Sequence, residues 1–275
     1  MGEEKLTSRL HLANRRGLVW LRPASPLLTV AAAVALLAGP IALRAQDAPA
    51  ASSTASAHTS ASHPTPAHAA SAKPVLGAPV KSYGSPGAPI KLEVFTDYQC
   101  PSCRNFFETT LRPLINDYVA SGKVYVLHHD YPLSGHQYSG MAARWANAAA
   151  RVGQFGNVEG ALYDNQMAWE MTGDIKKFVS TSMPAADFKR VEQQMEGCDG
   201  PGPTAAPAGG VAYPPGGHPC PLDAFITSDI ALGMKIPVEA TPTYRITYKG
   251  QPLPAASGAV SWAILRQFFD SLLAQ

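Results

Sequence analysis

The sequence has little excess charge of either sign. Its 22 lysine and arginine residues nearly balance 20 aspartate and glutamate residues, so the formal net charge is +2. Even this excess belongs to the N-terminus, because residues 1–45 hold six basic and two acidic residues and the remainder is net negative by two. The charge balance therefore gives no reason to expect nucleic acid as a partner.

Cysteine is scarce as well, and its spacing argues against a zinc centre. The four cysteines include one close pair, Cys100 and Cys103, while Cys198 and Cys220 stand far apart. A four-cysteine zinc site is usually built from two close pairs. We therefore expect no metal bound by the four cysteines together.

Long apolar runs are rare too, and the one near the N-terminus indicates export. Residues 27–43 carry no charge and follow Arg15, Arg16 and Arg22. This pattern predicts a basic cytoplasmic region over 1–26 and a signal peptide or membrane anchor over 27–45. Cleavage and retention as a membrane tether both stay open, with retention favoured, and either places the rest of the chain outside the cytoplasm, in the periplasm.

The next segment, 46–73, is composed mainly of Ala, Ser, Thr, Pro and His. It has almost no charge and no large apolar side chain, so nothing offsets the entropy cost of ordering it. We expect a disordered linker there. A folded domain should then occupy 74–275.

The hydrophobic pattern of this domain alternates between strand and helix signals. Strands are expected at 90–96 and 123–129 around a helix at about 101–120, which Pro113 should kink. A helical insert at about 136–234 should include an aperiodic surface loop at 197–220. Strands at 243–248 and 253–258 and a final helix should follow. The order is β-α-β, a helical insert, then β-β-α, which makes an α/β domain.

The close cysteine pair has the layout of a redox dithiol. Cys100-Pro101-Ser102-Cys103 follows a predicted strand and opens a predicted helix. The unpaired N–H groups and the dipole at a helix N-terminus favour a thiolate at the first position. The second thiol lies one turn further on, close enough to close a small disulfide ring.

The residues Phe95-Thr96-Asp97-Tyr98-Gln99 before this motif, and the distant Ala240-Thr241-Pro242-Thr243-Tyr244, resemble the DsbA-like branch of the thioredoxin superfamily. These are extracytoplasmic thiol–disulfide oxidoreductases, and the resemblance covers roughly residues 75–275. It implies a thioredoxin-like fold with the helical insert.

The resemblance also assigns roles to residues. It implies that Cys100 is an exposed nucleophile, Cys103 a buried resolving thiol, and Pro242 a cis proline beside them, with Thr241, Pro101 and Ser102 in support. No cofactor is implied beyond the redox disulfide. The implied partners are thiols or disulfides of exported proteins and a separate membrane redox protein that resets the dithiol.

One position departs from the family pattern. Relatives usually carry a buried acid six residues before the nucleophilic cysteine, where this chain has Val94. Glu93 is one residue away and therefore on the opposite strand face. Asp97 is the other candidate for proton transfer, although we expect it to shape the turn before the helix.

Cys198 and Cys220 flank the aperiodic segment and are expected to pair as a structural disulfide, since an exported protein meets an oxidising compartment. Free thiols, or a second redox couple that exchanges electrons with Cys100 and Cys103, are the alternatives.

Two other functions stay open from the sequence. A copper-binding chaperone would use Cys100, Cys103 and a histidine, and His128-His129-Asp130 at a strand end suggests where one would come from. A non-catalytic binding domain would require an inert dithiol. We expect an enzyme, and Pro101-Ser102 between the cysteines favours the oxidising direction.

Overall fold

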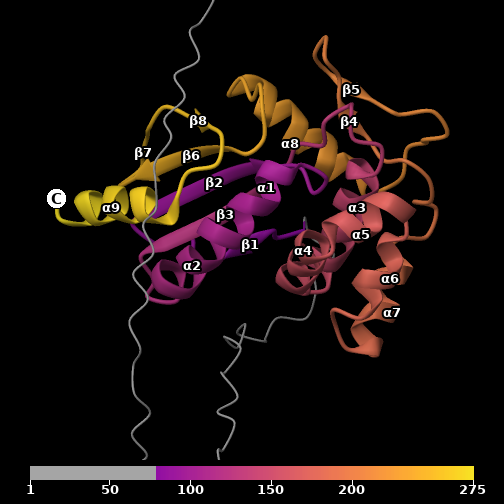
Figure 1. The fold of residues 1–275 in the computed structure, drawn as a ribbon, viewed down its shortest axis with the longest axis horizontal. Helices are drawn as coiled ribbons and strands as arrows, with labels where there is room; N and C mark the ends of the chain where they lie inside the picture. The colour runs from indigo at the N-terminus through magenta and orange to yellow at the C-terminus, as the bar shows by residue number, and fades with distance from the viewer. Residues whose placement is uncertain (1–78) are drawn as a thin grey trace, which may run out of the picture. The chain divides into compact units, whose positions relative to one another are not determined.

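The computed structural model describes residues 79–275 (Figure 1). The predictions for 1–26, 27–45 and 46–73, and the start of the domain at residue 74, lie outside the described residues. Within the described part of the chain, no helix is both long and apolar enough to cross a membrane.

A mixed sheet forms the centre of this domain. The strand β2 lies between β3, to which it is parallel, and β6, to which it is antiparallel, and the sheet order is β1-β3-β2-β6-β7 with β8 also paired to β6. The predicted central strands are confirmed because their apolar residues are buried. The strands of this sheet are β1 Ser82–Tyr83, β2 Ile90–Thr96, β3 Val124–Asp130, β6 Thr243–Tyr248, β7 Gln251–Pro252 and β8 Ala256–Ser257.

The helix after β2 runs without a break, although not as one α-helix. Pro113 has no N–H to donate and its ring crowds the preceding turn. The structure accommodates it between two π-helical turns, which widen the helix. The successive parts are α1 Pro101–Phe106, η1 Phe107–Leu111, α2 Arg112–Leu114 and η2 Ile115–Val119.

The two faces of the sheet are covered by different helices. Phe106 of α1 stacks on Tyr244, the β6 partner of Val94, with ring centroids 6.2 Å apart. Gly233 of α8 approaches Phe95 on the other face, where an added Cβ would lie 3.4 Å from that ring. Consecutive residues of β2 therefore face α1 and α8 in turn.

The predicted helical insert consists of several short helices. In Figure 1 the helices α3 to α7 gather at the end of the sheet opposite α9. The sequence did not distinguish α5 and α6, which have only seven and six residues. Gly173 with φ 72° ends α5, and Asp174 caps α6 by accepting from the Lys177 N–H. The helices are α3 Ser139–Arg151, α4 Phe155–Asp164, α5 Gln166–Thr172, α6 Ile175–Ser180, α7 Ala185–Gln194 and α8 Asp223–Lys235.

The segment 197–220 is more than the surface loop that we expected. It contains a short hairpin, β4 Thr204–Ala205 with β5 Val211–Ala212. Its Gly202 lies against Gly140 of α3 so closely that an added Cβ on Gly140 would come within 2.5 Å of the Gly202 carbonyl oxygen. The prediction of a simple surface loop was wrong, because Gly140 and Gly202 let two backbone segments pack directly together. Such packing needs no periodic apolar side chains, so the sequence pattern did not reveal it.

The C-terminal end follows the predicted order with a shorter return strand. The turn uses Lys249 and Gly250, both with positive φ. The expected strand at 253–258 is divided, because only β7 and β8 pair with β6 and Pro254 lies between them. The last helix, α9 Trp262–Leu273, begins at Ser261, whose side chain accepts from the Ile264 N–H.

Candidate functional site

The dithiol lies where β2 ends and α1 begins. Cys100 is the N-cap of α1, and its carbonyl oxygen accepts hydrogen bonds from the N–H groups of Cys103 and Arg104 at 3.0 and 3.1 Å. The two cysteines are free and form no disulfide with one another. Cys103 is fully buried, whereas 8% of Cys100 is exposed.

The prediction that Cys100 is exposed is wrong, because the residue is buried and the exposed part of the motif is Pro101-Ser102. Two segments far away in sequence cover Cys100. Its Sγ donates to the carbonyl oxygen of Thr241 at 3.4 Å, and its own carbonyl accepts from Gln166 Nε2 at 3.1 Å.

The two thiols differ strongly in acidity. The hydrogen bond with the Cys103 thiol lowers the pKa of Cys100 from 9.0 to about 6 against the opposing effect of burial, and the Thr241 side chain, which can donate to the thiolate, adds to the lowering. Burial raises the pKa of Cys103 well above its usual value, and its hydrogen bond to Cys100 raises it further. At neutral pH Cys100 is a thiolate, and it accepts a hydrogen bond from the Cys103 thiol.

Thr241 and Pro242 lie beside this pair, as expected. The peptide bond between them is cis. Thr241 is buried, and among the described residues its hydroxyl has no hydrogen-bond partner. This hydroxyl is therefore free to donate to a thiolate at Cys100.

Asp97 shapes the turn before the helix. Its Oδ1 accepts from the Gln99 N–H at 2.7 Å, and its Oδ2 accepts from the Leu133 N–H and from His136 Nδ1, each at 2.7 Å. Ser139 also donates to Oδ1. The carboxylate thus ties the loop after β3 to the cysteine turn, and its oxygens are occupied.

Glu93 points away from the dithiol. It faces the α8 side, with Oε2 2.8 Å from Arg245 Nη2 and 3.2 Å from Lys91 Nζ. Burial opposes its ionisation, yet hydrogen bonds with His129 and Arg245 lower the pKa of Glu93 to about 2. A carboxylate held ionised in this way, on the wrong face, is poorly suited to exchange a proton with Cys103.

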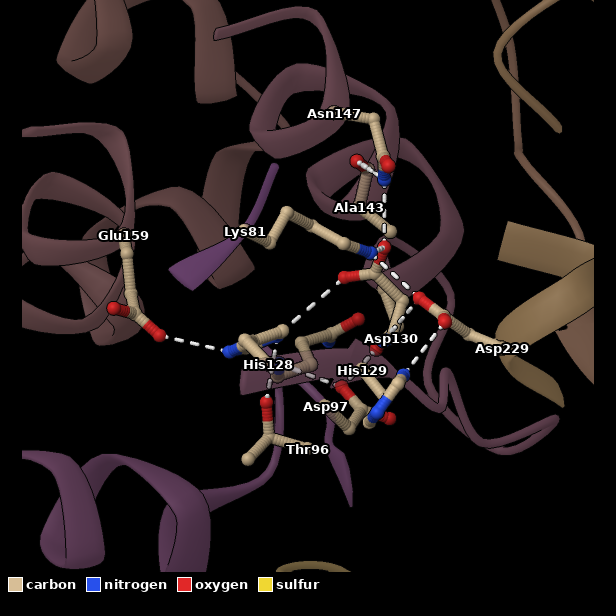
Figure 2. Close-up of polar contacts among 12 residues, drawn as sticks. Lys81, Thr96, Asp97, His128, His129, Asp130, Ala143, Asn147, Glu159 and Asp229 are labelled. Atoms are coloured by element: carbon tan, nitrogen blue, oxygen red, sulfur yellow. Dashed lines mark hydrogen bonds and ion pairs between the residues drawn. The ribbon is translucent and has the colours of Figure 1, made fainter. Parts of the chain in front are cut away.

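A buried polar network behind the dithiol was not predicted (Figure 2). The adjacent His128 and His129 point to opposite faces of β3. His128 Nδ1 bonds Glu159 Oε1 and His129 Nδ1 bonds Asp229 Oδ1, each at 2.8 Å. In residues 79–275, no group of three or more His, Cys, Asp or Glu side chains is arranged to hold a metal ion.

A buried lysine joins the two histidine branches of the network. Lys81 pairs with Asp130 and, at 2.6 Å, with Asp229. Asn147 Nδ2 donates to Asp130 Oδ2 at 2.6 Å. The residues that pair with His128, His129 and Asp130 come from distant parts of the chain. In the sequence, only the His128-His129-Asp130 run itself indicated a polar site at the strand end.

Gln166, at the start of α5, is a further residue that the sequence did not reveal. Its Nε2 donates to the carbonyl oxygens of Tyr98 and Cys100 at 2.6 and 3.1 Å. The side chain is buried and links the helical insert to the cysteine turn.

Cys198 and Cys220 form a disulfide, the pairing expected from the sequence. Beside it lies the buried Arg144, whose Nε and Nη2 each reach a different Asp223 oxygen at 2.8 Å. Arg144 also donates to the carbonyl oxygens of Cys198 and His218 at 3.1 and 2.6 Å. A buried ion pair thus holds the same segment that the disulfide closes.

Comparison with known proteins agrees with this geometry. A thioredoxin family model matches residues 79–199. The probable disulfide bond formation protein D of Bacillus cereus is 27% identical over 124 residues, which cover 43% of this chain and 57% of that protein. The corresponding protein of Bacillus anthracis is 36% identical over 55 residues, covering 20% of this chain and 25% of the relative. The chain therefore spans little more than half the length of the curated relatives it matches.

Solved structures show the same fold. α-DsbA1 of Wolbachia pipientis superposes with a TM-score of 0.53 and 15% identity over 71% of this chain and 91% of that protein. Oxidised BdbD from Bacillus subtilis gives a TM-score of 0.50 and 16% identity over 72% and 97%. The predicted thioredoxin-like fold is confirmed.

Proposed function

Since the described residues form a thioredoxin-like domain homologous to disulfide bond formation protein D, we propose that this chain is a thiol–disulfide oxidoreductase. Cys100 and Cys103 are its redox disulfide, and thiols of exported proteins are its substrates. The observation that carries the proposal is the opposite shift of the two thiol pKa values within one helical turn.

The two sulfurs have different tasks in the oxidising direction. A substrate thiolate attacks Cys100 Sγ of the disulfide, the Cys100–Cys103 bond breaks, and Cys103 leaves with the electron pair. The second substrate thiolate then attacks the substrate sulfur of the mixed disulfide. Cys100 leaves as a thiolate and the substrate disulfide is complete.

The acidity of Cys100 favours this direction. A pKa of about 6 in place of 9.0 stabilises the reduced form at pH 7 by ~1.4 kcal/mol, equivalent to ~30 mV for a two-electron couple. A protein whose reduced form is stabilised is the stronger oxidant. The side chains that stabilise the Cys100 thiolate in this way are those of Cys103 and Thr241.

The setting of the reaction is part of the proposal. The apolar run at 27–43, with arginines before it, supports an extracytoplasmic, periplasmic domain held by a tether. The Cys198–Cys220 disulfide supports an oxidising compartment. A separate membrane redox protein would reoxidise Cys100 and Cys103 after each turnover.

The test is oxidation of a reduced, unfolded substrate protein by the oxidised chain, followed by counting of substrate thiols. We expect stoichiometric substrate disulfides with the native chain and none with Cys100→Ser, while Cys198→Ser/Cys220→Ser serves as the matched control that keeps the dithiol. Absence of oxidation by the native chain would refute the proposal, and tight copper binding by the reduced form would favour the chaperone alternative.

A further inference from the structure

A buried histidine with no role in the exchange steps lies on the dithiol side of the sheet. His128 is 2% exposed and pairs in register with Val94 of β2, so both side chains face α1. Glu159 of α4, fully buried, accepts from its Nδ1 at 2.8 Å. Tyr83 donates to the other Glu159 oxygen.

Cys103 needs a proton source on this side. When the Cys100–Cys103 bond opens, Cys103 becomes a thiolate in a site where it is 0% exposed and where burial disfavours the charge. Solvent has no direct access to such a sulfur. A proton has to come from a group inside the domain.

The hydroxyl of Thr96 extends the histidine pair toward the dithiol. Thr96 Oγ1 lies 3.0 Å from His128 Nε2, and Thr96 is four residues before Cys100 on the same face of β2 as Val94. Its hydroxyl can accept a proton from the imidazole and donate its own onward.

Tyr163 packs beside the helix that carries Cys103. Its ring packs against Phe107, four residues after Cys103 on the same helix, and against Tyr98, with centroids 4.8 and 5.3 Å apart. Tyr163 is 1% exposed, and among the described residues its hydroxyl has no hydrogen-bond partner. Burial raises the pKa of Tyr163, charge on Cys103 raises it further, and the Thr96 side chain lowers it. The Tyr163 phenol is therefore close enough to interact with both Cys103 and Thr96.

The charges around His128 keep it protonated at neutral pH. Burial lowers the pKa of His128, but hydrogen bonds and charge from Asp130 and Glu159 outweigh this and raise it from 6.5 to about 9. Asp130 Oδ1 lies 3.5 Å from His128 Nε2, and the other oxygen of Asp130, Oδ2, pairs with Lys81. Two carboxylates, Glu159 on α4 and Asp130 on β3, and the ring of Tyr98 face the His128 imidazole. The titratable groups that face those two carboxylates are Lys81, which pairs with Asp130, and Tyr83 and Tyr163, which are close to Glu159.

We propose that His128, held by Glu159, donates the proton that Cys103 takes up when the disulfide opens, through the hydroxyls of Thr96 and Tyr163. The proposal rests on the proposed function and adds the internal proton source to it.

The step balances without another reactant. The substrate thiolate forms a bond to Cys100 Sγ, the Cys100–Cys103 bond breaks, and Cys103 receives the electron pair. The Tyr163 hydroxyl protonates the Cys103 thiolate and is reprotonated by Thr96, which takes the proton of His128 Nε2. His128 becomes neutral, and reoxidation of the dithiol returns the proton by the reverse route.

The experiment follows disulfide opening by dithiothreitol in the oxidised full chain between pH 6 and 10, with rapid acid quenching and alkylation to count thiols. The rate constant is expressed per dithiothreitol thiolate. We expect the native rate constant to be level to about pH 8 and to fall as His128 loses its proton near pH 9. His128→Gln should be ~100-fold slower at pH 7, at the low end of general-acid effects, and should lack the fall.

Matched variants separate this role from a structural one. His129→Gln alters the neighbouring buried histidine on the opposite face, and Tyr98→Phe removes another buried, unpartnered hydroxyl. Both should keep the native pH profile. Tyr163→Phe removes a single oxygen and should lose the rate as His128→Gln does, which decides the matter if His128→Gln does not fold.

Native rates and pH profiles in His128→Gln or in Tyr163→Phe would overturn the proposal, as would loss of rate in Tyr98→Phe with none in Tyr163→Phe. If the native chain does not exchange with dithiothreitol at all, the proposed function fails instead. The two failures are therefore distinct.

Discussion

The buried His128 should make the stability of the folded domain fall as the pH rises. Its pKa is about 9 in the folded protein and 6.5 in the unfolded chain, where Glu159 and Asp130 are no longer beside it. A group whose pKa is raised on folding contributes its full stabilisation below the unfolded pKa and loses it as the pH passes the folded one. The window is therefore pH 6.5 to about 9.

The expected size of the effect follows from the two pKa values. A difference of about 2.5 units corresponds to ~3 kcal/mol of unfolding free energy lost across this window. That is a large part of the 5–15 kcal/mol that is typical of a domain. His129, whose pKa is also raised against burial by Asp229 and Glu93, should add to the same trend.

Urea unfolding of the oxidised chain at pH 6 and pH 9.5, followed by circular dichroism, measures the loss. The oxidised form is used because its cysteines do not titrate. His128→Gln should be less stable at pH 6, since Glu159 loses its partner, and should show a drop smaller by ~3 kcal/mol between the two pH values. An equal drop in the native chain and in His128→Gln would refute the reasoning.

Three further predictions concern the cysteines. Alkylation of the reduced protein at pH 7 should label Cys100 before Cys103, and Cys103→Ala should accumulate mixed disulfides through Cys100; preferential labelling of Cys103, read by peptide mass, would reverse the assignment. Thr241→Val should raise the pKa of Cys100 by an amount equivalent to ~1 kcal/mol, because the thiolate loses a hydrogen-bond donor. The pKa is measured by thiolate absorbance, and an unchanged titration would exclude the Thr241 hydroxyl as a donor. Cys198→Ser/Cys220→Ser should lower the unfolding free energy by ~3 kcal/mol while keeping most of the thiol-oxidation rate, and lost rate at unchanged stability would indicate an electron shuttle.

The sequence predicted those parts of the fold in which local pattern and burial agree. The strands at 90–96 and 243–248 have the bounds expected, because both are flanked by turn residues and bury apolar side chains such as Leu92 and Ile246. The short helices α5 and α6 were missed, since six or seven residues carry too little periodicity. Only the Gly173-Asp174 cap separates them.

The site was predicted where its residues are adjacent in the chain. Cys100 and Cys103 are three positions apart, so the helix that they open could be predicted. The causes of their pKa shifts are tertiary, because the Cys103 thiol lowers the pKa of Cys100 and burial raises that of Cys103. The contacts of His128 could not be predicted in the same way, because Glu159 and Thr96 reach it from other elements. Arg144 is similar, since its partner Asp223 is 79 positions away.

The reduction potential of the Cys100–Cys103 couple, measured in glutathione buffers at pH 7, tests the central claim most directly. The acidic Cys100 stabilises the reduced form by the equivalent of ~30 mV, so the account predicts a couple above about −240 mV, more oxidising than thioredoxin at about −270 mV. A value at or below about −270 mV would contradict it and indicate a reductant.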